Sequence, residues 1–390
     1  MPVRNAVRVA CALLPCVWLL ACGGDHEVAA EPEPEMPELL RLTCRGGVGT
    51  STEPTEIMDV DSVVLRSHGK RIGTAISAAR LGEAAYAKAL AQQFNYGTAE
   101  NEMKWDATEP TPGNFTFAAA DSIADFAKQH EMSLKGHTLV WYSQLPAWVS
   151  ALTGESVREA MTRHIEGSIT HFREKYPGLV VSWDVVNEAI DTPMGVATLR
   201  DSVFLRELGE DYIAEAFRVA RTADPDALLF YNDFGIEGTS AKANFAYEMI
   251  KKLVDAGVPI DGVGFQMHTG ADDRGPSREE LRTNIQRYVD LGLKVNISEM
   301  DVNLCRYSNG PLALEQQRFR YNRIVSTCFE FEACESVAVW GVTDKYSWLN
   351  TFQTCSGAPY QAKPLILNDD YQRKPAFWGV YDALKGCYYE

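Results

Sequence analysis

The feature that most constrains the fold is a repeated alternation of short apolar runs with longer amphipathic stretches, which starts near residue 62 and continues to the C-terminus. Short runs rich in β-branched residues are typical of buried strands, and the stretches between them have the length and spacing of helices. Strands that alternate with helices form a parallel sheet, because each helix returns the chain before the next strand begins. Eight such strands predict an α/β fold, a (β/α)8 TIM barrel in a single domain.

The expected strands are residues 71–76, 95–99, 133–140, 180–186, 227–231, 262–267, 295–298 and 337–340. The expected helices are residues 83–94, 118–131, 156–176, 211–223, 241–256, 277–291, 314–332 and 375–385. Some helices are followed by stop signals, such as Asp224-Pro225 after one and Gly257 after another. No linker-like gap interrupts the pattern, so we expect no second domain.

The N-terminal segment has the composition of an export signal. Two arginines precede an apolar stretch over residues 9–21, which is shorter than the ~20 residues that a membrane-spanning helix needs. The run Leu-Leu-Ala-Cys at residues 19–22 resembles a bacterial lipoprotein signal, in which cleavage precedes the cysteine and Cys22 is acylated; ordinary secretion is the alternative. We therefore expect an exported protein, anchored as an outer-membrane or cell-surface lipoprotein or otherwise secreted.

The stretch after Cys22 includes the run EVAAEPEPEMPE. Its prolines prevent regular backbone hydrogen bonding and its glutamates repel one another, so an extended tether is its natural state. We therefore divide the chain into a lipoprotein signal peptide at residues 1–21, a lipid-anchored flexible linker at residues 22–61 and the barrel at residues 62–390.

The formal net charge of −16 at pH 7 argues against a polyanionic partner. Phosphate-rich ligands need local clusters of lysine and arginine, and the sequence has no such run. We expect no binding to nucleic acid.

Six cysteines lie beyond the N-terminal segment: Cys44, Cys305, Cys328, Cys334, Cys355 and Cys387. An even number in an exported chain favours disulfides, and no CxxC pair or nearby histidine has the spacing of a zinc site, so we expect no metal. Cys328 and Cys334 are close enough in sequence for a local bridge. Loops after strands seven and eight of a closed barrel are neighbours, which makes Cys305 with Cys355 reasonable and leaves Cys44 for Cys387; other pairings of these four stay open.

Polar and aromatic residues gather where the expected strands end. In a (β/α)8 barrel these ends meet at one mouth, where functional groups lie. Two of them are carboxylates, Glu188 after WDVVN and Glu299 after KVNIS. A single Glu after a strand is usually a solvated loop residue, and a single His or Trp on an apolar face usually belongs to the core. Six or more such strand ends at one mouth favour function, with Glu188 and Glu299 as a pair.

Two carboxylates with amide, imidazole and aromatic neighbours, and without a metal cluster, are suited to cleaving a glycosidic bond. One carboxyl group protonates the leaving oxygen while the other attacks or stabilises the sugar cation, and flat rings stack on sugar faces. Asn187, directly before Glu188, can donate to the 2-hydroxyl of the reacting sugar.

The motifs ENEMKW, GHTLVWYSQLPAW, WDVVNEA, VGFQMHT, ISEMDV and WGVTDKYSWL follow one another from about Arg71 to the end of the chain. In order and spacing they resemble family 10 of the glycoside hydrolases, the endo-β-1,4-xylanases. The resemblance implies a retaining double displacement with Glu188 as general acid/base and Glu299 as nucleophile. It also implies that His268, oriented by Asp301, holds Glu299 ionised.

The resemblance assigns further residues to substrate binding. Those that match the family's glycone side, which holds the two sugars before the scissile bond, are Glu100, Asn101, Lys104, His137, Trp141, Gln144, Asn187, Gln266, Trp340 and Trp348. Asn232 matches a polar position near the reacting centre, and His268 is counted with the substrate-binding residues. In the family, the tryptophan that corresponds to Trp348 crowds the place of a hexose hydroxymethyl group, which implies xylose rather than glucose.

Two positions depart from the family pattern. Tyr142 stands where the family usually has the histidine of Trp-His-Ser-Gln. In one interpretation the tyrosine hydroxyl takes over a hydrogen bond of that histidine. In the other, the substitution alters the pH profile of the activity or a sugar subsite. Phe234-Gly235 stands where the family often has Tyr-Asn, which keeps a ring but loses two polar groups on the leaving-group side.

We therefore expect a surface-anchored retaining endo-β-1,4-xylanase that binds xylan and xylo-oligosaccharides, acts as a monomer and needs no cofactor. One alternative is a non-catalytic lipoprotein that binds glycans, against which the two intact carboxylates argue. Another is the same chemistry on a different β-linked glycan, such as a mixed-linkage glucan.

Overall fold

The computed structural model describes residues 42–44, 65–271, 275–352 and 355–389. The predicted signal peptide, Cys22 and most of the predicted linker lie outside these residues. Leu42–Cys44 form strand β1, which pairs antiparallel with β13 (Cys387–Tyr389), and a disulfide joins Cys44 to Cys387. For β1 the prediction of a flexible linker is wrong, because backbone pairing and the disulfide bind it to the C-terminal strand.

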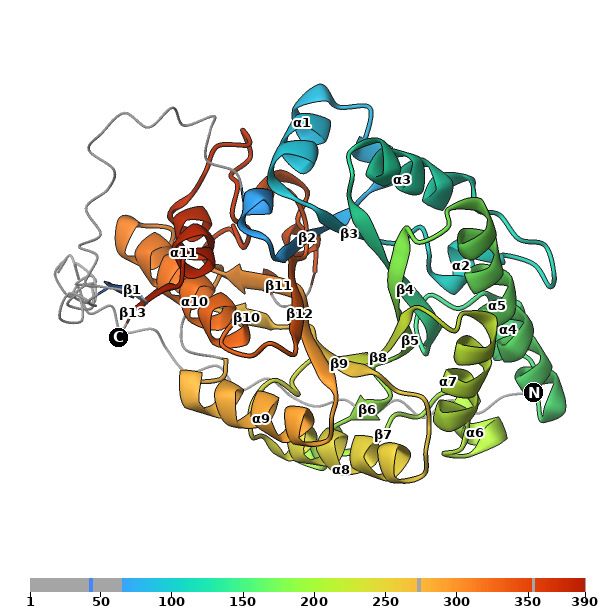
Figure 1. Cartoon of the computed structure of the whole chain (residues 1–390). Helices are drawn as coiled ribbons and strands as arrows, with labels where there is room; N and C mark the ends of the chain where they lie inside the picture. The colour runs from blue at the N-terminus through green and yellow to red at the C-terminus, as the bar shows by residue number, and fades with distance from the viewer. Residues whose placement is uncertain (1–41, 45–64, 272–274, 353–354, 390) are drawn as a thin grey trace, which may run out of the picture. The chain divides into compact units, whose positions relative to one another are not determined.

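Eight parallel strands close into a barrel (Figure 1). They are β2 (Arg71–Ile76), β3 (Tyr96–Ala99), β4 (Ser133–Trp141), β5 (Val180–Asn187), β8 (Leu228–Asp233), β9 (Gly262–Phe265), β11 (Lys294–Asn303) and β12 (Cys334–Val339). Each strand pairs with the next in this order, and β12 pairs with β2 to close the ring. The predicted (β/α)8 TIM barrel is confirmed.

Helices return the chain around the outside of this ring (Figure 1). They are α1 (Ala84–Gln93), α3 (Ala118–Gln129), α5 (Glu155–Lys175), α7 (Tyr212–Ala223), α8 (Ala241–Asp255), α9 (Arg278–Asp290), α10 (Pro311–Cys328) and α11 (Pro375–Leu384). Two of them, α8 and α9, begin at a serine whose side chain caps the helix. At α9 the Ser277 hydroxyl accepts from the Glu280 backbone N–H while the Glu280 carboxylate accepts from the Ser277 N–H, which satisfies two donors at the helix start.

The segments that follow the barrel strands carry short elements that the sequence analysis did not predict. They are α2 (Trp105–Thr108), α4 (Ala147–Ser150), α6 (Val203–Leu208), the hairpin β6 (Ile190–Asp191) and β7 (Thr198–Leu199), β10 (His268–Gly270), and the 3-10 turns η5 (Asp344–Tyr346) and η6 (Trp348–Asn350). Pieces this short show no clear hydrophobic period, which is the signal that reveals longer strands and helices.

The barrel interior is packed with large side chains. Trp183 of β5 is fully buried, and a Cβ added to Gly136 of β4 would lie 2.0 Å from the Trp183 ring. Glycine is therefore required at residue 136, because the ring of the neighbouring strand occupies the space of a side chain. This contact lies directly before His137, at the level where the strand begins to face the cavity described below.

The six cysteines form three disulfides with the predicted pairing. Besides Cys44–Cys387, these are Cys305–Cys355 and Cys328–Cys334. The predicted helix at residues 314–332 is wrong at both ends: α10 begins at Pro311, which occupies its first turn, and ends at Cys328. The chain must turn after Cys328 for its sulfur to reach Cys334 at the start of β12.

Among the described residues, no helix is both long enough and apolar enough to span a membrane.

Candidate active site

A cavity of about 660 Å³ lies at the carboxyl ends of the barrel strands. Every predicted catalytic, supporting and substrate-binding residue except Asn232 lines it. Its other lining residues are Tyr142, Ser143, Phe234, Asn303, Leu349 and Phe352. Of these, the sequence analysis noted Tyr142 and Phe234 only as departures from a family pattern, and it missed the rest.

Glu299 projects from β11 at a point where the pairing of this strand with β12 shifts register, between Ile297 and Met300. Such an irregularity re-aims a side chain relative to a regular strand. Its Oε1 accepts a hydrogen bond from Asn232 Nδ2 at 2.7 Å, and its Oε2 lies 3.3 Å from His268 Nε2. The residue is 5% exposed, so these partners fix its side chain in one orientation.

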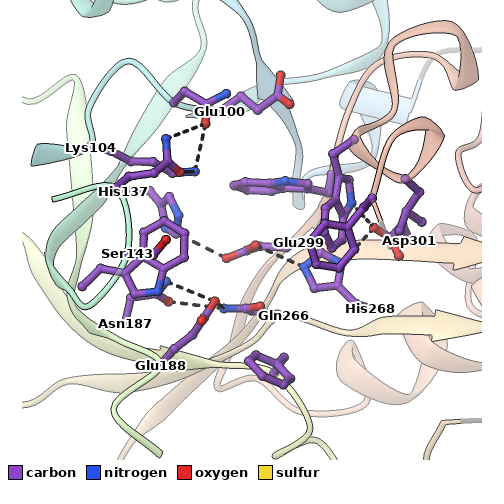
Figure 2. A pocket seen from close by; sticks show the side chains of 18 of the residues that line it. Glu100, Lys104, His137, Ser143, Asn187, Glu188, Gln266, His268, Glu299 and Asp301 are labelled. Carbon is purple, nitrogen blue, oxygen red and sulfur yellow. Dashed lines mark hydrogen bonds and ion pairs between the residues drawn. The ribbon is translucent and has the colours of Figure 1, made fainter. Parts of the chain in front are cut away.

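The electrostatics of Glu299 follow from these neighbours. Burial raises the pKa of a carboxyl group, but here the hydrogen bond from His268, the charges of His137 and His268, and the Asn232 amide outweigh burial and lower the pKa of Glu299 to about 2. Figure 2 shows Glu299 between His137 on one side and His268 on the other. This lowered pKa agrees with the predicted ionised state of Glu299.

His268 is in turn held by Asp301, as predicted. Its Nδ1 lies 2.8 Å from Asp301 Oδ2, and the same oxygen accepts from Trp348 Nε1 at 2.8 Å. Burial lowers the pKa of a histidine, but Asp301 and Glu299 outweigh it and raise the pKa of His268 well above its usual range. One carboxylate oxygen therefore fixes both the cation beside Glu299 and the ring of Trp348.

Glu188 follows the last residue of β5 and has a different environment. Its backbone has φ 54°, a left-handed conformation that costs free energy in a non-glycine residue and is therefore held by its surroundings. The Glu188 N–H donates to the Asn232 carbonyl at 2.9 Å, and the Glu188 carbonyl accepts from Arg200 Nε at 2.8 Å. The Glu188 carboxylate accepts from Gln266 Nε2 at 3.0 Å (Figure 2).

Buried amides link the two carboxylates. Asn232 donates through Nδ2 to Asn187 Oδ1 at 3.0 Å as well as to Glu299, and Gln266 Nε2 lies 3.3 Å from the same Asn187 oxygen. Asn232 is 0% exposed and does not line the cavity. It is a positioning residue that orients Glu299 and Asn187 rather than a residue that contacts a bound molecule.

We keep the name glycone side for seven of the ten residues that the resemblance assigns there, because His137, Asn187 and Gln266 lie against the two glutamates. The seven are Glu100, Asn101, Lys104, Gln144, Trp141, Trp340 and Trp348. Lys104 Nζ donates to Gln144 Oε1 at 2.8 Å and to Asn101 Oδ1 at 3.0 Å. Burial lowers the pKa of Lys104, and the carboxylates of Glu299 and Glu100 partly offset this effect. The structure thus brings together polar groups from the segments after β3 and β4, the Trp141 ring at the end of β4, and two indole rings from the segment after β12.

A buried chain of charges beneath Glu299 escaped the sequence analysis. His137 Nδ1 lies 4.0 Å from Glu299 Oε1 and 2.9 Å from Asp184 Oδ2, and Lys135 Nζ pairs with Asp184 Oδ1 at 2.6 Å. Lys135 and Asp184 are each 1% exposed. The sequence did contain a signal for this pair: a lysine and an aspartate lie inside apolar runs expected to be buried strands, and a buried charge requires a partner of opposite sign.

The arrangement provides two carboxyl groups with different environments on one cavity. Glu299 is ionised and fixed by a cation, whereas Glu188 is bounded by neutral amides. Such a pair can attack an acetal carbon with one group and exchange a proton with its oxygen through the other.

Comparison with known proteins gives the family. The model of glycosyl hydrolase family 10 matches residues 62–383. The chain belongs to this family. It is 38% identical to endo-1,4-beta-xylanase B of Thermotoga neapolitana over 302 residues, which cover 77% of this chain and 83% of the relative.

Solved structures of this family superpose on the barrel. Native xylanase 10B from Thermotoga maritima has a TM-score of 0.76 and 37% identity, with 83% of this chain and 98% of that chain covered. Xylanase 10B from Thermotoga petrophila, solved in complex with xylobiose, has a TM-score of 0.76 and 36% identity, with coverage of 83% and 97%.

Proposed function

We propose that this protein is a retaining endo-β-1,4-xylanase that hydrolyses internal bonds of xylan, with Glu188 as general acid/base and Glu299 as nucleophile. The observation that carries the proposal is the unequal environment of the two carboxyl groups on one cavity, in a chain that belongs to glycosyl hydrolase family 10. Glu299 is held as an anion by His268 and Asn232, whereas Glu188 is bounded by the Gln266 and Asn187 amides.

In the first step, an oxygen of Glu299 forms a bond to the anomeric carbon of the reacting xylose while the bond to the glycosidic oxygen breaks. Glu188 gives its proton to that oxygen, and the shortened chain leaves. In the second step, water attacks the anomeric carbon, Glu188 takes a proton from the water, and the Glu299 oxygen leaves as a carboxylate. Two inversions give net retention, as is general for family 10.

The relatives support xylan as the substrate. The Thermotoga petrophila enzyme was solved with xylobiose, and a mutant of a Thermoanaerobacterium saccharolyticum xylanase was solved with xylotetraose. In this chain we assign the sugars before the scissile bond to the glycone side. Trp348, fixed by its bond to Asp301, would crowd the hydroxymethyl group of a hexose at this place.

Release of reducing sugar from xylan tests the assignment. We expect Glu299→Ala to reduce kcat by at least about 10⁴-fold, because the covalent step is lost. Glu188→Ala should reduce kcat/KM on xylan by about 10³-fold but much less on aryl xylobiosides with good leaving groups, which need no proton. Native-like hydrolysis of xylan by either variant would contradict the assignment, and xylo-oligosaccharide binding without any turnover by the unmodified protein would instead favour a glycan-binding protein.

We also propose that the protein is exported and anchored through an acylated Cys22, with residues 22–41 as a tether, and that it acts as a monomer. The support is the composition of the N-terminal segment. Metabolic labelling with a radioactive fatty acid should mark the unmodified chain but not Cys22→Ala, and only the unmodified chain should fractionate with membranes. Equal labelling of both would contradict the anchor, and light scattering that gives twice the chain mass would contradict the monomer.

A further inference from the structure

Two large rings are exposed in the cavity that Glu188 lines. Tyr142 and Phe234 are each 40% exposed and both line the cavity. A ring that faces water in a cleft forgoes the stabilisation that burial of its apolar area would give. Rings in this situation commonly serve as contact surfaces for a ligand, since the apolar face of a sugar can cover them.

Tyr142 is fixed from behind by a cation. The Arg200 guanidinium lies 4.3 Å from the Tyr142 ring centroid, and the Trp141 ring meets Tyr142 edge to face at 5.9 Å. Arg200 is itself fully engaged: it donates to the carbonyls of Glu188 and Ile190 at 2.8 and 3.0 Å and pairs with Asp191 at 3.4 Å. The ring is therefore held in one orientation, with its other face toward the cavity.

The Phe234 ring is likewise held on one face by a cation, the Lys242 ammonium. Lys242 Nζ lies 3.6 Å from the Phe234 ring centroid and donates to Asp233 Oδ1 and to the Phe234 carbonyl, each at 2.7 Å. Two rings from different strand ends, β4 for Tyr142 and β8 for Phe234, are thus each fixed by a cation that is itself hydrogen-bonded.

The position of Tyr142 relative to Glu188 indicates which sugar it would meet. The Arg200 guanidinium that covers the Tyr142 ring also donates to the carbonyls of Glu188 and Ile190, so the ring lies beside the segment that runs from the end of β5 into β6. Tyr142 follows the glycone-side Trp141 at the end of β4, but its ring is covered by Arg200, which comes from the segment after the hairpin β6 and β7 and not from an element of the glycone side. Because the acid gives its proton to the leaving oxygen, the Tyr142 side of Glu188 is the side of the leaving group.

The ring, not the hydroxyl, is the part of Tyr142 available for this role. Within the described part of the chain, the Tyr142 hydroxyl makes no hydrogen bond. The sequence analysis offered the interpretation that this hydroxyl takes over a hydrogen bond of the family's histidine. The structure shows no partner for such a bond among the described residues.

We propose that Tyr142, held against Arg200, stacks on the first xylose unit of the leaving group and, together with Phe234, makes a two-ring site for it. This inference rests on the proposed function. It makes Tyr142 a residue that determines which acceptors and leaving groups the enzyme accepts.

Competition between water and a sugar acceptor tests the proposal. With an aryl β-xylobioside as donor, the glycosyl-enzyme is attacked either by water or by added xylobiose, and only xylobiose must occupy the leaving-group site. We expect Tyr142→Ala to lower the ratio of transfer to hydrolysis about tenfold, and Tyr142→Phe to keep it within about twofold, because the ring does the stacking. A general loss of structure would lower both products together and leave the ratio unchanged.

A matched control is Tyr360→Ala. Tyr360 is 44% exposed and lines a separate cavity of about 490 Å³, so its loss should leave the ratio unchanged. An unchanged ratio in Tyr142→Ala, or an equal loss in Tyr142→Phe, would overturn the stacking role. Absence of any donor hydrolysis by the unmodified protein would instead contradict the proposed function, so the two failures are distinguishable.

Discussion

On the glycone side of the cavity, amide side chains are hydrogen-bonded to one another and to the buried Lys104, whereas beyond Glu188 two rings are exposed and only their backs are held. Lys104 is 6% exposed and has two amide partners, while Tyr142 and Phe234 are 40% exposed. We call the second group, with Arg200 and Lys242, the leaving-group side. The difference matches the proposed chemistry, because charge develops at the glycone sugar, where fixed dipoles are most effective, and a product must depart from the other side.

The largest effect short of losing a carboxylate should come from the cation beside the nucleophile. His268→Gln keeps a donor of similar size but removes the positive charge, so we expect kcat/KM to fall by about 10²-fold or more. The pKa of Glu299, about 2 in the native protein, should rise toward its ordinary value of 4.5. The acid limb of the pH profile should therefore move to higher pH in the variant.

The pH dependence of kcat/KM on an aryl xylobioside measures this shift. The native enzyme should keep an ionised nucleophile down to about pH 2, whereas His268→Gln should lose activity as pH falls through 4.5. An acid limb at the same pH in both proteins would show that His268 does not control Glu299. Glu188→Gln is the control, since it removes the acid and leaves the nucleophile's partners in place.

The free energy of unfolding should also depend on the ion pair of His268 with Glu299, with one loss of stability at low pH and another at high pH. The lowered pKa of Glu299 contributes stability that is present above pH 4.5 and is lost as pH falls toward 2. The raised pKa of His268 contributes stability that is fully present below pH 6.5 and is lost as pH rises through its native pKa. Thermal unfolding as a function of pH should show both losses in the native protein and a flatter curve in His268→Gln; parallel curves would contradict the coupling.

Substitution of Lys104 tests whether the glycone side depends on the hydrogen bonds that this buried lysine makes. Lys104→Met keeps the aliphatic stem but removes the donors to Asn101 and Gln144, so the amides lose their orientation. We expect kcat/KM on xylotriose to fall about 10²-fold. Lys345→Met is the control, because Lys345 is exposed and pairs with Glu83 at the surface, where an ion pair contributes little. An equal effect of both substitutions would contradict a local role for Lys104.

A disulfide restrains the glycone side alone. Cys305–Cys355 joins the segment after β11 to the segment after η6; Asp301 lies near the end of β11, and Trp348 is the first residue of η6. Replacing both cysteines by serine should lower the free energy of unfolding by about 4 kcal/mol, compared with about 2 kcal/mol for Cys328 and Cys334, because the closed loop is longer. Only the first pair should raise KM for xylotriose, by about threefold. A KM increase of the same size in both would assign it to stability rather than to the sugar site.

Much of this molecule could be predicted from its sequence because the decisive signals are local. The β-branched runs that end in Glu188 and Glu299 identify two strands and their carboxylates at once, and ordered motifs place the amides around them. The ion pair of His268 with Glu299 was predicted through the family resemblance, and the contacts agree with it.

The features that the sequence analysis did not predict depend on contacts between residues that are distant in the chain. Arg200 lies in the segment after the hairpin β6 and β7, and nothing near it in sequence indicates that its guanidinium would cover the Tyr142 ring. Asn232 matched a position near the reacting centre, but its complete burial follows only from the packing of β5, β8 and β11 around it. Short pieces such as β10 have no period long enough to recognise.

The smallest expected change adds a group to the leaving-group side. Phe234→Tyr places a hydroxyl at the exposed edge of a ring that Lys242 already holds, so the ring contact stays and one hydrogen bond to a sugar becomes possible. A single exposed hydrogen bond contributes about 0.5–1.5 kcal/mol, which predicts a rise of about threefold in the ratio of transfer to hydrolysis with xylobiose as acceptor. Phe352→Tyr is the matched control, because Phe352 is 48% exposed and packs on the glycone-side Trp348 with 4.4 Å between ring centroids. If both substitutions raised the ratio of transfer to hydrolysis equally, the added hydroxyl would act only by making the cavity more polar. The difference between the glycone side and the leaving-group side would then not explain which acceptors the enzyme uses.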